Sequence, residues 1–167
     1  LYGMAAALVE MGAERARKAE AREIWLQRLI EAEAVDRQAS SLRYQLRVAK
    51  FPVHRDLEGF QWPESPVLEQ QIRQLATGNF MEEAHNLILV GGTGTGKTHL
   101  ATALGVSAIH AEKRVRFYNA VDLVNQLEKE KAQGRAGALA RQLTQMDGVI
   151  LDELGYLPFP ESGGALL

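Results

Sequence analysis

Residues 91–98 constrain this chain more than any other segment, because they combine four glycines with a lysine and three threonines. They read Gly-Gly-Thr-Gly-Thr-Gly-Lys-Thr, a complete G-x-x-x-x-G-K-[ST] pattern. In such a loop the backbone N–H groups surround the phosphates of a nucleotide. The lysine reaches the outer phosphates and the threonine hydroxyl contacts Mg²⁺. The pattern predicts a nucleotide site at the start of a helix.

The residues on either side of this loop fit the same interpretation. Residues 86–90 form a short apolar run typical of a buried strand, and residues 100–106 predict a helix. Strand, glycine loop and helix N-terminus together direct free N–H groups and a positive dipole end at an anion, which disfavours a glycine-rich turn without a ligand. The residues expected to bind the nucleotide are Gly91, Gly92, Thr93, Gly94, Thr95, Gly96, Lys97, Thr98 and His99.

A second motif, Val149 to Glu153, is an apolar strand that ends in two acids. Asp152 is suited to hold Mg²⁺ with Thr98, and Glu153 to polarise a water for attack on the γ-phosphate. Two solvated acids at a strand end are the alternative interpretation, which the pairing with Lys97 and Thr98 disfavours. A general base favours hydrolysis over phosphoryl transfer, so Glu153 and Lys97 are the expected catalytic residues.

The order of elements indicates an α/β fold in which a parallel sheet carries flanking helices. Residues 1–50 predict a helical module of two or three helices, with a break or cap at Ser40–Ser41. Residues 51–66 predict an irregular, proline-containing linker, and residues 67–167 a nucleotide-binding domain. The elements expected in that domain are strands at 86–90, 114–118 and 149–151, and helices at 67–76, 100–106, 121–134 and 138–145.

Composition narrows the function classes. A formal net charge of −2 gives no global argument for nucleic-acid binding, and the absence of cysteine excludes disulfides and thiolate metal sites. No apolar run reaches the length of a bilayer span, so we expect a cytoplasmic protein with no membrane partner.

Local features leave two further hypotheses. Arg43, Arg47 and Lys50 follow i, i+4, i+7 spacing, so on a helix they share one face that could contact DNA phosphates; a solvated helix face is the alternative. Phe60 and Trp62 are candidates to cover an adenine ring.

Residues 87–101 and 151–167 resemble the AAA+ ATPases of the IstB/DnaC group, and the transposition-helper branch, IstB, in particular. Residues 74–78 and 116–123 fit the same pattern. The resemblance implies an ATPase that uses ATP and Mg²⁺ and assembles as a homo-oligomer on duplex DNA. It also implies hydrolysis of ATP when the cognate transposase engages the helper.

The resemblance also implies elements that this sequence does not display. In that family a further strand, which carries a polar sensor residue, lies between those expected at 86–90 and 149–151. This strand, the arginine finger and a second sensor are all expected beyond Leu167. We therefore expect a fragment that lacks full hydrolytic activity. A DnaC-like helicase loader and a truncated, non-catalytic nucleotide-binding remnant are the alternatives.

Overall fold

The computed structural model describes residues 1–14, 22–135 and 137–155. It divides into two compact units, Leu1–Tyr44 and Gln45–Leu167. Within the described ranges, no helix has both the length and the apolar character that crossing a bilayer requires.

The first unit contains helix α1 (Tyr2–Glu14) and most of helix α2 (Arg22–Ala49). The two helices approach closely at Gly3, where an added methyl group would lie 2.5 Å from the Ala32 carbonyl oxygen. The carboxylate of Glu33, only 6% exposed, accepts hydrogen bonds from Arg37 Nε at 2.9 Å and from the Met4 N–H at 3.2 Å. These bonds, that from Arg37 first, lower the pKa of Glu33 to about 2.

The break expected at Ser40–Ser41 is wrong, because α2 is continuous from Arg22 to Ala49. A serine inside a helix costs only about 0.5 kcal/mol relative to alanine, which a helix of 28 residues tolerates. Arg43 also donates to the Ser40 hydroxyl at 3.1 Å, so this side chain has a partner on the helix surface.

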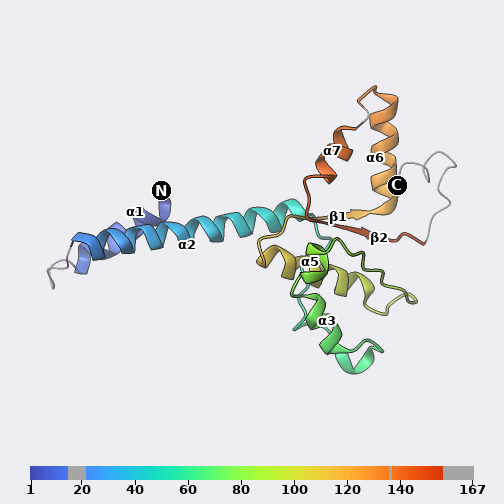
Figure 1. Cartoon of the computed structure of the whole chain (residues 1–167), viewed down its shortest axis with the longest axis horizontal. Coiled ribbons are helices and arrows are strands. Elements are labelled where there is room, and N and C mark those ends of the chain that lie inside the picture. Colours follow the sequence, from blue (N-terminus) through green and yellow to red (C-terminus); the bar gives the residue numbers. More distant parts are fainter. Residues whose placement is uncertain (15–21, 136, 156–167) are drawn as a thin grey trace. The chain divides into compact units, whose positions relative to one another are not determined.

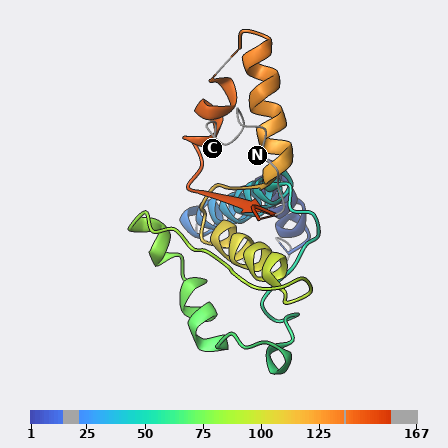
Figure 2. The same cartoon turned by 90° about the vertical axis from the view of Figure 1, so that its right-hand side faces the viewer.

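The second unit is built on two parallel strands, β1 (Val115–Asn119) and β2 (Gly148–Asp152). Their register pairs Val115 with Gly148 and Asn119 with Asp152. Helix α5 (Lys97–His110) lies on one face of the sheet, and helices α6 (Ala120–Ala132) and α7 (Ala138–Leu143) lie on the other (Figures 1 and 2). A parallel sheet between helical layers confirms the predicted α/β class.

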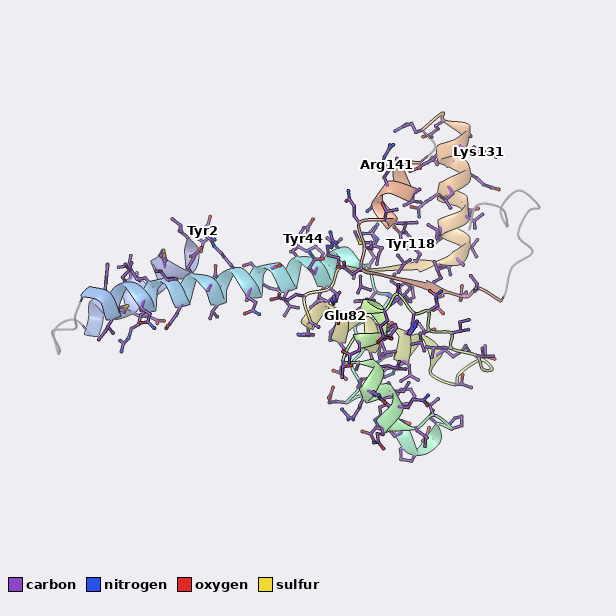
Figure 3. All side chains as sticks on the ribbon, in the orientation of Figure 1. Tyr2, Tyr44, Glu82, Tyr118, Lys131 and Arg141 are labelled. Atoms are coloured by element: carbon purple, nitrogen blue, oxygen red, sulfur yellow. The ribbon has the colours of Figure 1, made fainter. Side chains whose placement is uncertain are left out.

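The two faces of the sheet are covered by different apolar clusters. Gly105 lets α5 approach β2, since a methyl group there would lie 2.8 Å from Ile150 Cδ1. On the other face Tyr118 of β1, labelled in Figure 3, packs with Leu123 of α6 and Leu139 of α7. Further along α5, buried side chains from three segments form one core: Leu57, Phe60, Ile72, Leu100, Ala103 and Leu104.

The segment before the sheet contains three short helices: η1 (Trp62–Glu64), α3 (Glu69–Leu75) and α4 (Asn79–Glu82). Only α3 was expected from the sequence. In the predicted linker 51–66, residues 51–61 are irregular as expected, whereas residues 62–64 form the short helix η1. Leu57 and Phe60 are nevertheless buried, so part of this segment belongs to the core of the second unit.

The strand expected at residues 86–90 is wrong. These residues have no regular secondary structure, and the side chains of Ile88 and Val90 are 79% and 90% exposed. A strand exists only where a neighbour completes its hydrogen-bond ladder. Within the described residues the sheet consists of β1 and β2 alone, so the apolar run at 86–90 has nothing to pair with.

Candidate nucleotide-binding site

The glycine-rich loop occupies residues 91–96, directly before α5. Gly94 and Gly96 have φ angles of +77° and +84°, a region that other residues rarely adopt. A methyl group at Gly94 would meet no atom within 4 Å, whereas at Gly96 it would lie 2.6 Å from the Phe60 ring. Gly96 is therefore required both by its backbone conformation and by its contact with Phe60.

Two side chains of the loop converge on one backbone oxygen. Lys97 Nζ donates to the Gly92 carbonyl at 2.6 Å, and Thr95 Oγ1 donates to the same oxygen at 2.9 Å. A phosphate oxygen carries more negative charge than this carbonyl and is the stronger partner for an ammonium group. The position and chemistry of Lys97 thus fit a phosphate-binding role.

The two sequence motifs meet at Thr98 and Asp152, which lie 54 positions apart in the chain. Thr98 Oγ1, in the first turn of α5, donates to Asp152 Oδ2 at 2.8 Å, at the carboxyl end of β2. A hydroxyl and a carboxylate oxygen are ligands that Mg²⁺ accepts in proteins. These two residues therefore fit a magnesium ion bound beside the loop.

Glu153, the expected general base, follows β2 with a left-handed φ of +62°. Its N–H donates to Asp152 Oδ1 at 3.0 Å, which ties the two acids together. Its own carboxylate accepts a hydrogen bond from the side-chain amide of Asn119. Asn119 Oδ1 in turn accepts from the Val121 N–H at 2.9 Å, so this residue also caps α6.

Asn119 was missed as a site residue in the sequence. It ends β1 as Asp152 ends β2, and the carboxyl ends of parallel strands meet at one edge of a sheet. A polar residue at the end of the predicted strand 114–118 was the available signal.

His99, expected at the nucleotide, contacts the segment before α3 instead of residues 91–96. Its Nε2 lies 2.8 Å from the Asp56 carbonyl oxygen, and its ring meets the edge of Phe60 with centroids 5.2 Å apart. Phe60 is 9% exposed and also packs against Trp62, with the ring centroids 4.7 Å apart. Phe60 therefore lies against Gly96 of the loop, and His99 and Trp62 pack on the Phe60 ring.

The residues proposed to contact DNA do not all lie on one helix. Arg43 and Arg47 are exposed on α2, but Lys50 comes after its last residue, Ala49. Lys50 has a φ of +57°, the left-handed conformation common just past a helix end, and Pro52 follows. The single helical face expected for all three is thus wrong.

Residues 156–167, on which part of the family resemblance rests, lie outside the described residues. Within the described part, a glycine loop opens a helix, and an acid at the end of a parallel strand reaches that helix. This combination defines the class of phosphate-loop nucleotide-binding proteins.

Comparison with known proteins gives the family. The family model described as "IstB-like ATP binding protein" matches residues 1–167. The chain belongs to this family of IstB-like ATP-binding proteins.

The relatives carry names that link them to ATP binding and to insertion sequences. The putative ATP-binding protein of insertion sequence IS5376 from Geobacillus stearothermophilus is 37% identical to this chain over 134 residues, which are 80% of this chain and 53% of the relative. The putative ATP-binding protein of IS21 from Pseudomonas aeruginosa is 37% identical over 131 residues, which are 78% of this chain and 49% of the relative. The putative ATP-binding protein of IS232 from Bacillus thuringiensis is 29% identical over 123 residues, which are 73% of this chain and 49% of the relative. The chain spans about half the length of these curated relatives.

Proposed function

We propose that this chain is the ATP-binding part of a helper ATPase that assembles on duplex DNA and assists an insertion-sequence transposase. The hydrogen bond between Thr98 and Asp152 carries the proposal at the nucleotide site, because it joins the two motifs that a Mg-nucleotide requires. The family and the insertion-sequence names of the relatives support the role in transposition. Those names also favour a transposition helper over a helicase loader.

Each residue of the site has a defined task in this proposal. Lys97 and the loop N–H groups hold the phosphates, while Thr98 and Asp152 hold Mg²⁺. When bound, Mg²⁺ neutralises the charge that develops on the phosphates. Glu153 accepts the proton of the attacking water, and Asn119 orients the Glu153 carboxylate. Hydrolysis is proposed for the whole protein, of which this chain corresponds to about half by the length of its relatives.

Nucleotide binding is tested by titrating ATP with Mg²⁺ into the wild-type chain and the Lys97→Ala variant. Removing the ammonium should weaken ATP affinity by about 100-fold, since an ionic hydrogen bond to phosphate is lost in a loop shaped around it. His110→Ala, a substitution at the far end of α5, serves as the control and should bind ATP normally. Equal affinities of wild type and Lys97→Ala would contradict the proposed site.

DNA binding is proposed to involve Arg43 and Arg47, which are exposed cations on α2. The double substitution to alanine should weaken duplex affinity at low salt and lower the salt slope by about 2, with ATP affinity unchanged. Arg73→Ala with Arg114→Ala is a charge-matched control, because these arginines are already paired with Glu69 and Asp147.

Fluorescence anisotropy with duplex and single-stranded DNA of equal length, with and without Mg-ATP, provides the measurement. ATP-dependent binding that prefers duplex supports the transposition helper. A preference for single strands would instead favour the helicase loader, and binding without an ATP effect would favour a non-catalytic remnant. Unchanged duplex affinity in the arginine variant would remove Arg43 and Arg47 from the proposal.

A further inference from the structure

We propose that His99 is a positioning residue of the nucleotide site. Its ring fastens a turn, residues 56–60, to the first turn of α5, and this turn supports the phosphate loop at Gly96. The inference rests on the proposed binding of nucleotide at residues 91–98 and assigns to His99 a role in shaping the loop.

The turn at residues 56–60 is held together by its own contacts. Asp56 Oδ1 accepts a hydrogen bond from the Gly59 N–H at 2.8 Å, and the Phe60 N–H donates to the Leu57 carbonyl at 3.3 Å. Leu57 and Phe60 are 6% and 9% exposed and share a core with Leu100 of α5. The turn is therefore a compact body anchored on the helix by two apolar side chains.

His99 adds a hydrogen bond to the apolar packing that holds the turn on α5. Its Nε2 lies 2.8 Å from the Asp56 carbonyl oxygen, and since a carbonyl only accepts, Nε2 carries the proton. The imidazole also meets the Phe60 ring at 88°, the edge-to-face arrangement that aromatic rings prefer. The half-buried ring is thus committed to the turn through two different contacts.

The turn reaches the phosphate loop through Phe60. A methyl group at Gly96 would lie 2.6 Å from Phe60 Cε2, so the ring lies directly against this glycine. Gly96 is the N-cap of α5 and holds a φ of +84°, the conformation from which the free N–H groups of the first helical turn follow. A displaced Phe60 would leave Gly96 without its support and misdirect the N–H groups that meet phosphate.

This arrangement predicts for which ligands the binding affinity falls when His99 is substituted. The loop contacts only the phosphates of a nucleotide. His99→Ala should therefore lower the affinities for ATP and for inorganic tripolyphosphate by the same factor. We expect a factor of about three to ten, which corresponds to one net hydrogen bond. Substitution of a side chain that contacts the base would lower the affinity for ATP only.

The experiment titrates Mg-ATP into the wild-type chain and its variants, with Mg-tripolyphosphate measured by competition. His99→Gln keeps an N–H donor and should recover affinity to within about twofold of wild type. Phe60→Leu retains an apolar side chain but removes the ring from Gly96, and should lower both affinities in parallel. His110→Ala, a histidine of the same helix remote from the loop, should change neither. Thermal melts of each variant show that binding is compared between folded proteins.

Three outcomes would overturn the role of His99: affinities unchanged in His99→Ala, a loss confined to ATP, or no recovery in His99→Gln. Failure of the proposed function gives a different result, because the wild-type chain would then bind neither ligand or Lys97→Ala would bind as wild type does.

Discussion

The phosphate loop and the five residues before it behave in opposite ways. Residues 91–98 form a glycine loop that leads into α5, as their sequence predicts, and Gly94 and Gly96 have left-handed φ angles. Residues 86–90 were expected to form a strand but have no regular structure, and Ile88 and Val90 are exposed. The loop is specified by local backbone preferences and by contacts with α5 and Phe60. A strand depends on a neighbour elsewhere in the chain.

The largest expected effect tests the local side of this comparison. Gly96→Val places a β-branched residue at a φ of +84° and drives its side chain into Phe60. Strain of this kind costs about 1–3 kcal/mol for the backbone, and overpacking adds a similar amount. The free energy of unfolding, measured with denaturant, should fall by about 3 kcal/mol or more, with loss of ATP binding.

The matched control for this variant is Gly134→Val, which shares a positive φ of +67° but meets no atom within 4 Å. It should cost less than Gly96→Val and leave ATP binding intact. An equal loss of stability in both variants would show that the contact with Phe60 contributes nothing.

An intermediate effect is expected where strands do have partners. Arg114 donates to Asp147 from its N–H at 2.7 Å and from its guanidinium at 3.1 Å, at the start of the β1–β2 ladder. The guanidinium contact is the main cause that lowers the pKa of Asp147. Asp147→Asn should therefore reduce the free energy of unfolding at pH 7 by about 1 kcal/mol.

The same pair predicts a dependence on pH. Because the pKa of Asp147 is lower in the folded state, its contribution is present above the ordinary aspartate pKa and is lost as pH falls below it. The difference in unfolding free energy between wild type and Asp147→Asn should shrink when the pH is lowered from 7 towards 3. A difference that stays constant over this range would contradict the assignment.

The smallest effect is expected in the apolar run. Ile88 is 79% exposed, so Ile88→Thr should change the free energy of unfolding of this chain by no more than about 0.5 kcal/mol. Leu100→Ala, at a residue only 2% exposed, provides the contrast and should cost about 2–5 kcal/mol. A large loss in Ile88→Thr would show that residues 86–90 are packed in solution.

How much of the molecule could be predicted follows from the same distinction. The helices at 100–106 and 121–134 and the strands at 114–118 and 149–151 carry periodic patterns, and α5, α6, β1 and β2 lie at these places. The pairing of β1 with β2 in parallel followed from the helices between them. The strand at 86–90 failed because an apolar run does not state which strand will pair with it.

The candidate site was predictable to a similar extent. The loop and the acidic pair are local motifs, and their meeting at Thr98 and Asp152 follows from the topology of a parallel sheet. Asn119 escaped notice because an asparagine at a strand end is also an ordinary helix cap, a role it does play. The ring of His99 could not be placed from the sequence, since its partner lies 43 positions away in an irregular segment.

The proposed nucleotide site depends most on Thr98 and Asp152, which together would bind the magnesium of a Mg-nucleotide. The most direct test compares ATP affinity with Mg²⁺ and with EDTA in the wild-type chain, Asp152→Asn and Asp147→Asn. Asp147 precedes β2 and Asp152 ends it, so the two variants differ in which end of the strand loses an acid. We predict that Mg²⁺ strengthens ATP binding by about tenfold in the wild type and in Asp147→Asn, and that this gain disappears in Asp152→Asn. If Mg²⁺ strengthened ATP binding by the same factor in Asp152→Asn as in the wild type, Asp152 would not be a ligand of the magnesium ion.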